Sequence, residues 1–299
     1  MLKKDWDKPF FMAVGLSKPH LPWYVPQEFF DLYQLDTVKI PHYRLDDLDD
    51  ILTPQGKRKF DPTDDFLWCS QNEHLFKAAV RAYMASVSYA DACIGIILDA
   101  LNKSEYAKNT IVIIWGDHGW HLGEKLRFRK TTLWTESTKL PLIIKTPEMR
   151  QKAVCNRTVN LIDLYPTLID LCGLPKRDVL DGRSFAPLLR NPEEKWPYPS
   201  ITIKEEGSYS INDEDWRYTY YADGTEELYN LKNDPMEWTN LINDMDKESA
   251  EAKKELLKWK PESFTKGLPV NKILKKFDAK NNLIERGDFK NIRIKNILE

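Results

Sequence analysis

The sequence predicts an α/β fold in which a mostly parallel sheet is flanked by helices and is followed by a small antiparallel sheet. Residues 8–16 and 111–115 are nearly unbroken apolar runs, which are typical of strands buried on both faces of a parallel sheet. Residues 72–101, between the two runs, carry apolar side chains at the spacing of one helix face. After residue 195 the pattern changes to short alternating segments separated by turn residues, as in antiparallel hairpins.

Each predicted element follows from its local pattern. The helix of residues 72–101 would carry the chain from the first strand to the second in a parallel crossover. Residues 140–145 form a third apolar run, and residues 160–173 predict a helix that begins near Asp163 and ends at a glycine cap. The strands expected in the antiparallel sheet are residues 201–204, 209–211, 216–221 and 227–231.

The domain organisation follows the changes in pattern. We expect residues 1–194 to form the α/β core, residues 195–245 a small antiparallel β subdomain, and residues 246–299 a lysine-rich tail with one helix at about 248–259. The chain has 299 residues and a formal net charge of −2, so nothing indicates a nucleic-acid-binding surface. No apolar run approaches the roughly 20 residues of a membrane span, so no span is predicted.

The candidate chemistry begins where the apolar run 111–115 stops. Gly116 is followed by Asp117 and His118, at the strand end where open α/β sheets bind ligands. A carboxylate beside an imidazole indicates a metal or acid/base pair; the alternative is a turn that Asp117 caps. His20 lies among three prolines after the run 8–16, which gives its side chain a defined direction. The alternative is that His20 only satisfies a loop carbonyl.

Three blocks of the sequence together resemble the type I sulfatases, of the wider alkaline-phosphatase superfamily. They are residues 9–22 (PFFMAVGLSKPHLP), residues 116–124 (GDHGWHLGE) with Lys130, and residues 227–241 (ELYNLKNDPMEWTNL). Within that family they most resemble the iduronate-2-sulfatase-type branch. The resemblance extends from residue 5 to about residue 245. It implies an alkaline-phosphatase/sulfatase-like fold, hydrolysis of a sulfate ester, and a sulfated small molecule or glycan as substrate.

The resemblance also implies roles for individual residues. Asp117 and His118 match two ligands of a Ca²⁺ ion, although many relatives carry asparagine where His118 stands. Lys130 matches a lysine that contacts the sulfate, and His20 matches a histidine that hydrogen-bonds the ester and assists the leaving oxygen. The chemistry agrees, because a sulfate monoester needs a cation at its non-bridging oxygens and a donor at its leaving oxygen.

Three further basic residues are candidates for contacting an acidic substrate. They are Lys18, Arg127 and Arg129. Lys18 lies in the first block, and the two arginines lie between the second block and Lys130. For the arginines, a solvated face is an equally good interpretation of the pattern.

The family's nucleophile is a formylglycine made from a cysteine in a C-x-P-x-R motif. None of the four cysteines (Cys69, Cys93, Cys155 and Cys172) is followed by that motif, and no serine supplies the S-x-P-x-R variant. The paired aspartates of the family's first strand are missing as well. We therefore expect this chain to be the C-terminal portion of the fold, with the nucleophile on an N-terminal half. Such a portion would expose an apolar sheet edge, be poorly soluble alone, and bind calcium weakly.

The sequence is compatible with three functional interpretations. The chain could be part of a sulfatase acting on a sulfated carbohydrate. It could instead be an independent protein that has lost its chemistry and serves as a binding or scaffold module. The third interpretation is a phosphate- or phosphonate-ester hydrolase of the same superfamily. Relatives of the sulfatase type are mostly exported, which implies a periplasmic or extracellular location.

Overall fold

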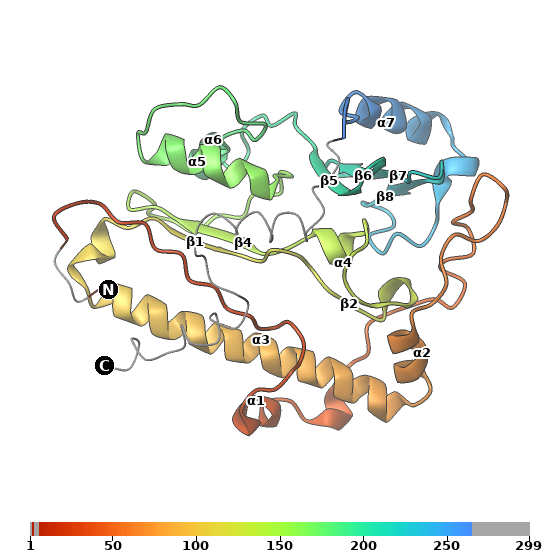
Figure 1. Ribbon diagram of the computed structural model, residues 1–299, viewed down its shortest axis with the longest axis horizontal. Helices are drawn as coiled ribbons and strands as arrows, with labels where there is room; N and C mark the ends of the chain where they lie inside the picture. The colour runs from red at the N-terminus through yellow and green to blue at the C-terminus, as the bar shows by residue number, and fades with distance from the viewer. Residues whose placement is uncertain (1, 3–5, 265–299) are drawn as a thin grey trace, which may run out of the picture. The chain divides into compact units, whose positions relative to one another are not determined.

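The computed structural model describes residue 2 and residues 6–264, and all of its helices and strands belong to one unit, residues 1–260 (Figure 1). The helices of this unit are α1 (Gln27–Asp31), α2 (Asp64–Ser70), α3 (Glu73–Asn102), α4 (Thr135–Thr138), α5 (Leu164–Leu171), α6 (Ala186–Arg190) and α7 (Lys247–Leu257). The strands are β1 (Val112–Trp115), β2 (His121–Leu122), β3 (Phe128–Arg129), β4 (Leu142–Lys145), β5 (Ser200–Glu205), β6 (Ser208–Asn212), β7 (Trp216–Tyr220) and β8 (Glu226–Asn230). Short 3-10 turns are η1 (Leu35–Thr37), η2 (Glu105–Lys108), η3 (Glu124–Leu126), η4 (Leu161–Asp163) and η5 (Leu241–Asn243).

Helix α3 confirms the predicted helix at 72–101 to within one residue. Its N-cap is Asn72, whose side chain accepts hydrogen bonds from the backbone N–H groups of His74 and Leu75. Its buried residues are Phe76, Val80, Ala85, Ser86 and Ala90. None of the α3 residues that follow Ala90 is buried. By length and composition alone α3 could cross a membrane, but core helices of soluble proteins pass the same test.

The predicted mostly parallel sheet is not found in the described residues. Strands β1 and β4 do form at the predicted apolar runs, but they pair with each other antiparallel, with Ile113 opposite Ile144. Residues 9–16 belong to no strand, so the predicted first strand and its parallel crossover are wrong for this structure. An apolar run in a sequence does not show whether a strand pairs parallel or antiparallel with its neighbour. Among the described residues no strand pairs parallel to β1 or β4.

The apolar runs are also less buried than the pattern predicts. Trp115 of β1 is 48% exposed and Ile143 of β4 is 59% exposed. By the register of the pair these two side chains lie on opposite faces, because Trp115 pairs with Leu142 and Ile143 with Ile114, so neither face is fully covered within the described part of the chain.

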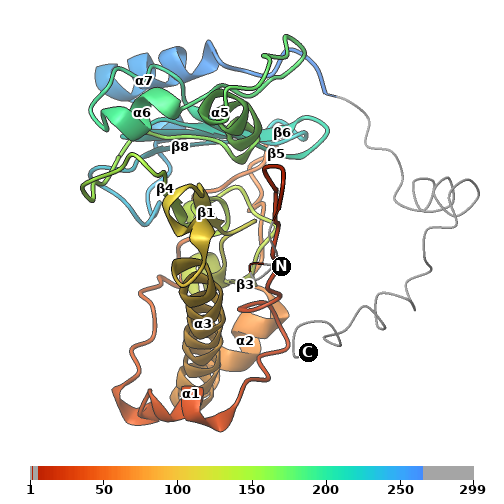
Figure 2. The ribbon, with the colours of Figure 1, turned by 90° about the vertical axis from the view of Figure 1, so that its left-hand side faces the viewer.

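The C-terminal sheet confirms its prediction closely. Strands β5, β6, β7 and β8 pair in chain order and all antiparallel. Tyr209, Ile211, Tyr218 and Leu228 are buried in it. Helix α7 contacts this sheet (Figure 2) and corresponds to the helix predicted at 248–259. Residues 265–299 of the predicted lysine-rich tail lie outside the described residues.

The hydrophobic core is formed by side chains from the irregular N-terminal segment, from helices α2 and α3, and from the connection between β1 and β4. Trp134 and Leu126 come from that connection and are fully buried. Other members of this cluster are Val38, Leu48, Ile51, Phe66, Cys69, Phe76, Val80, Phe128 and Tyr229. The β1–β4 connection, which contains residues 116–124 and Lys130, therefore contributes buried side chains to the core.

Candidate active site

The connection between β1 and β4 is held against α4 at a glycine. The backbone N–H of Gly119 donates to the carbonyl of Ser137 at 2.8 Å. A Cβ atom added at Gly119 would lie 1.9 Å from the carbonyl oxygen of Glu136. Only glycine fits this close approach, so the turn that presents Asp117 and His118 has one position relative to α4.

A buried lysine anchors the same connection from the other side. Lys125 is 1% exposed, and its Nζ lies 2.8 Å from Oδ1 of Asp47. It also donates to the backbone carbonyl of Glu237 and lies over the rings of Trp134 and Tyr229. Because a buried charge is costly unless it is paired, these partners fix the backbone of the connection just before Lys130.

The backbone on either side of Lys130 is strained. Lys125, Leu126, Arg129 and Thr131 all have φ between +53° and +77°, in the left-handed region that residues other than glycine rarely adopt. One other non-glycine residue among those described, Glu237, has positive φ. Strain of this kind persists only where the surroundings enforce it and is concentrated at functional sites. Lys125, one of the four, is held by its buried contacts to Asp47 and to the carbonyl of Glu237.

Lys130 and His118 form the centre of the site. The Nζ of Lys130 lies 2.9 Å from Nε2 of His118. On the other side of the ring, Nδ1 lies 2.8 Å from the carbonyl oxygen of Gly119. A lysine ammonium can only donate, so His118 accepts at Nε2 and donates from Nδ1 in its neutral form. Both ring nitrogens are engaged, which holds the imidazole and the ammonium in one arrangement.

His20 joins this pair from a segment nearly one hundred residues earlier in the chain. Its ring centroid lies 6.1 Å from that of His118. Its Nδ1 lies 2.8 Å from the carbonyl of Leu21, which leaves Nε2 without a partner in the described residues. The structure therefore brings together His20, His118 and Lys130, with Asp117 adjacent to them.

Trp120 is at the middle of this group, and the sequence interpretation gave it no role. The Lys130 ammonium lies 5.5 Å from its ring centroid, within the range of a cation–π contact. Its ring also packs against His20 at 5.5 Å and His118 at 6.2 Å. Behind it lie Trp23 and Tyr83. The sequence feature that could have indicated a role for Trp120 is its position directly after Gly119, in the turn that carries Asp117 and His118.

Asp117 and His118 do not make a calcium site by themselves. The Asp117 side chain is 87% exposed, and its Oδ1 lies 3.7 Å from Nε2 of His118. No group of three or more histidine, cysteine, aspartate or glutamate side chains within residues 6–264 could hold a metal. Calcium prefers six to eight oxygen ligands, whereas both nitrogens of His118 are already hydrogen-bonded. Asp117 is free to ligate, and the pair alone does not fit the ion.

The other three predicted residues are engaged elsewhere. The Lys18 ammonium donates to the carbonyl of Pro22 in its own loop. Arg129 pairs with Asp65 at 2.5 Å. Arg127 lies over the rings of Phe60 and Trp134, and burial lowers the pKa of its guanidinium. Within the described part of the chain, none of the three forms a hydrogen bond or ion pair with the side chains of His20, His118 or Lys130.

Burial shifts the pKa of three groups that belong to the β1–β4 connection or contact it. Desolvation, reinforced by the charge of Glu237, raises the pKa of Glu136 to about 7, and its Oε2 has no hydrogen-bond partner within the described residues. Desolvation raises the pKa of Asp47 to about 6, with Lys125 opposing that shift. It lowers the pKa of His121 to about 3, so that imidazole is neutral. Asp47 accepts a hydrogen bond from Lys125, and Nε2 of His121 is hydrogen-bonded to the hydroxyl of Thr132.

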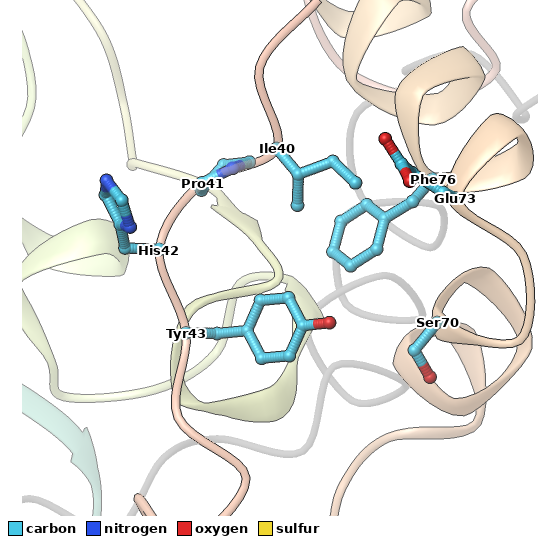
Figure 3. Close-up of a pocket in the computed structure, with 7 residues that line it drawn as sticks. All are labelled: Ile40, Pro41, His42, Tyr43, Ser70, Glu73 and Phe76. Atoms are coloured by element: carbon cyan, nitrogen blue, oxygen red, sulfur yellow. The ribbon is translucent and has the colours of Figure 1, made fainter.

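A separate cavity of about 390 Å³ is lined by Ile40, Pro41, His42, Tyr43, Ser70, Glu73 and Phe76. Figure 3 shows the rings of Tyr43 and Phe76 on one side of the backbone and His42 on the other. The cavity contains none of the predicted site residues. Its polar groups do not converge on one point, so it is not the candidate active site.

Comparison with known proteins gives two family models that match overlapping parts of the chain. The family model described as sulfatase matches residues 1–174. The model described as the C-terminal part of N-sulphoglucosamine sulphohydrolase matches residues 116–262. A sulfatase of Formosa agariphila is 39% identical over 85% of this chain and 50% of its own length. The chain spans about half the length of the curated relatives that it matches.

Two solved structures share the fold at low sequence identity. A protein in complex with its substrate D-glucosamine-2-N,6-O-disulfate is 20% identical, with a TM-score of 0.59 over 88% of this chain and 65% of its own. A phosphonate monoester hydrolase of Agrobacterium radiobacter is 22% identical, with a TM-score of 0.68 over 85% of this chain and 57% of its own. The neighbours therefore place the chain in the sulfatase and alkaline-phosphatase-like fold.

Proposed function

The chain belongs to the sulfatase family, and from that premise we propose that it carries the sulfate-binding part of a sulfatase active site. The observation that carries the proposal is the convergence of His20, His118 and Lys130 around Trp120. These residues come from separate segments and gather one fixed cation and two imidazoles. This set matches the needs of a sulfate monoester.

Each residue has a defined task in this proposal. Lys130 places a compact positive charge against the non-bridging oxygens, where charge grows in the transition state. His118 holds the Lys130 ammonium in position through its Nε2. His20, when protonated, donates from its unpartnered Nε2 to the leaving oxygen, as general acids do at poor leaving groups. Trp120 excludes water from one side of the group and supports all three.

The nucleophile is not among these residues. No cysteine of the chain stands in a C-x-P-x-R motif, so hydrolysis needs a formylglycine from another polypeptide segment. Asp117 is positioned to add an oxygen ligand to a calcium site completed by that segment. We therefore expect the chain alone to bind a sulfate ester and calcium weakly and to show no turnover.

A sulfated carbohydrate is the substrate class that we propose. It is supported by the sequence resemblance to the iduronate-2-sulfatase-type branch and by the family model for N-sulphoglucosamine sulphohydrolase. One protein of the same fold was solved with a disulfated glucosamine. The identity of the sugar and its linkage is open to direct measurement with a panel of desulfated and sulfated disaccharides.

The test is binding and turnover of two ester classes by the same preparation. We expect 4-nitrophenyl sulfate to bind to the chain without release of nitrophenol, and Lys130→Ala to weaken that binding at least tenfold. Preferential binding of a phenyl phosphonate would favour the phosphonate-ester hydrolase, whose representative shares the fold. Absence of binding to both esters would leave the scaffold interpretation and sink the sulfatase proposal.

A further inference from the structure

Arg183 lies in the loop between α5 and α6, and its backbone is held in one position. The N–H of Arg183 donates to Oδ1 of Asp163 at 2.8 Å, and Asp163 is buried. A Cβ atom added at Gly182 would lie 2.3 Å from the carbonyl oxygen of Ile162, so only glycine fits there. Phe185, two residues after Arg183, is buried. The base of the Arg183 side chain is therefore fixed, although the residue itself is exposed.

Two aromatic rings from two other segments of the chain flank the Arg183 guanidinium. Its Cζ lies 4.7 Å from the ring centroid of Tyr198 and 5.6 Å from that of Trp259, both within the range of a cation–π contact. Tyr198 precedes β5, and Trp259 follows the end of α7. Both aromatic residues are partly exposed. A guanidinium that packs on aromatic rings still has its N–H groups at its edge, where they can donate to an anion.

The polar ends of these three side chains have no partner among the described residues. The Arg183 guanidinium makes no ion pair or hydrogen bond within residues 6–264, where its contacts are the two rings. The hydroxyl of Tyr198 and Nε1 of Trp259 likewise make no hydrogen bond in that range. The neighbouring Trp196 differs, because its Nε1 donates to the carbonyl of Thr158 at 2.8 Å. Three groups that can donate hydrogen bonds are thus available around one pair of rings.

We propose that Arg183, Tyr198 and Trp259 form a second binding site, separate from the candidate active site, for one sulfated unit of a glycan. The sulfate group accepts hydrogen bonds from the guanidinium, and the sugar packs its C–H groups against the exposed parts of the two rings. Within the described part of the chain, none of the three side chains makes a hydrogen bond or ring contact with the candidate active site. The inference rests on the proposed function for its ligand class, and it goes further by naming a site that binds the glycan without hydrolysing it.

The chemistry of the three side chains favours this ligand. Arginine stays protonated at neutral pH, and its planar fork of N–H groups matches two oxygens of one anionic group. The tyrosine hydroxyl and the indole N–H add neutral donors beside the charge. The rings supply apolar area next to these polar ends, as in contacts where one side of a ligand is apolar and the other is polar. A sulfated sugar has both sides, an anionic group and an apolar C–H face.

Two other interpretations of the cluster fit the structure less well. A nucleotide base is bound by stacking on an open aromatic face, whereas the Tyr198 ring meets Trp196 at 79° and Trp259 at 81°. Rings at such angles form no parallel-walled slot for a flat base. The cluster could also serve only to fasten the end of α7. That helix has other anchors, because Leu256 is buried and the helix contacts β6, β7 and β8.

The experiment titrates the full chain with sulfated oligosaccharides of heparin and of carrageenan in a calorimeter. The background is Lys130→Ala, which removes the cation of the candidate active site, so the remaining binding reports on the second site. We expect Arg183→Ala to weaken that binding at least tenfold, and Arg183→Lys, which keeps the charge but not the fork, to recover only part of it. Arg190→Ala is the matched control, because Arg190 is exposed at the end of α6 and contacts no ring among the described residues; it should change the affinity less than twofold.

The outcomes separate this inference from the proposed function. Equal losses in Arg183→Ala and Arg190→Ala, equally tight binding of the desulfated oligosaccharides, or tighter binding of adenosine monophosphate overturns the second site. A lower unfolding temperature in Arg183→Ala with unchanged affinity of the folded fraction assigns the cluster to packing and also overturns it. A Lys130→Ala chain that binds neither oligosaccharide overturns it and leaves the proposed function standing. Binding that depends on Arg183 but is unchanged by Lys130→Ala supports the second site while counting against the proposed active site.

Discussion

The Lys130 ammonium lies 2.9 Å from Nε2 of His118, so the cation at the centre of the site has a side-chain partner rather than water alone. A lysine in water samples many rotamers and loses about 2 kcal/mol of side-chain entropy when it is fixed. Here much of that cost is met on folding, before any anion arrives. The site is preorganised for a negatively charged group.

The first prediction concerns the charge at position 130. Lys130→Gln keeps a long polar side chain and removes the cation, so affinity for 4-nitrophenyl sulfate should fall at least tenfold, or about 1.4 kcal/mol. The residual binding should also lose most of its dependence on ionic strength. Calorimetric titration at two salt concentrations measures both effects. Lys204→Gln, an exposed lysine on β5, is the control and should bind like the parent.

The second prediction concerns Trp120 as a positioning residue. Trp120→Leu removes the ring beneath Lys130, and the lost cation–π contact, worth about 0.5–2 kcal/mol, should weaken ester binding several-fold. Trp120→Phe should restore part of the affinity because a ring is kept. A role limited to packing would instead lower the unfolding temperature in both variants and leave the affinity of the folded fraction unchanged.

The third prediction concerns the pH dependence of stability through Glu136. Burial raises its pKa to about 7 in the folded chain, above the value of about 4.3 in an unfolded chain. The folded state therefore binds more protons between these values, and stability contributed by this group falls as pH rises from about 4.3 to 7. Glu136→Gln should be more stable than the parent at pH 8, by about 1–3 kcal/mol, with little difference at pH 4. Urea unfolding followed by tryptophan fluorescence measures the difference; a gap that widens at low pH would contradict the assignment.

The fourth prediction concerns the buried Lys125. Lys125→Met leaves Asp47 and the carbonyl of Glu237 without their donor, so the free energy of unfolding should fall by about 3–5 kcal/mol. Adding Asp47→Asn should recover part of the loss, because the uncompensated carboxylate is then removed. Equal losses in the single and double variants would show that the pair contributes through shape and not charge.

Local periodicity accounts for the parts of the fold that the sequence predicted. Helix α3 and the β5–β8 sheet have patterns that recur within the element itself, so their bounds were found to within a few residues. The direction of β1 and β4 was not found, because an apolar run carries no information on which neighbour it joins. The first predicted strand failed for the same reason.

Three of the residues named from the resemblance lie together in the structure, and the roles given to them stay predictions; the residues that support them were not named. Residue-by-residue resemblance identified His20, His118 and Lys130, which the structure brings together. Trp120 carried no signal beyond its place in the turn. Lys125 was missed because its partners lie 78 and 112 residues away, and a lysine in a polar stretch reads as exposed until those partners are known.

The ties made by Lys125 also set an order of events during synthesis. The connection that holds the site reaches its final form only when residue 47 and residue 237 are both available. Contacts of such separation form late and slow the folding of the chain that contains them. The growing polypeptide must therefore carry an immature site until Glu237 has left the ribosome. Stalled chains in which Glu237 is absent or still inside the ribosome should be cleaved by protease at the stretch 116–130, and chains in which Glu237 has emerged should resist.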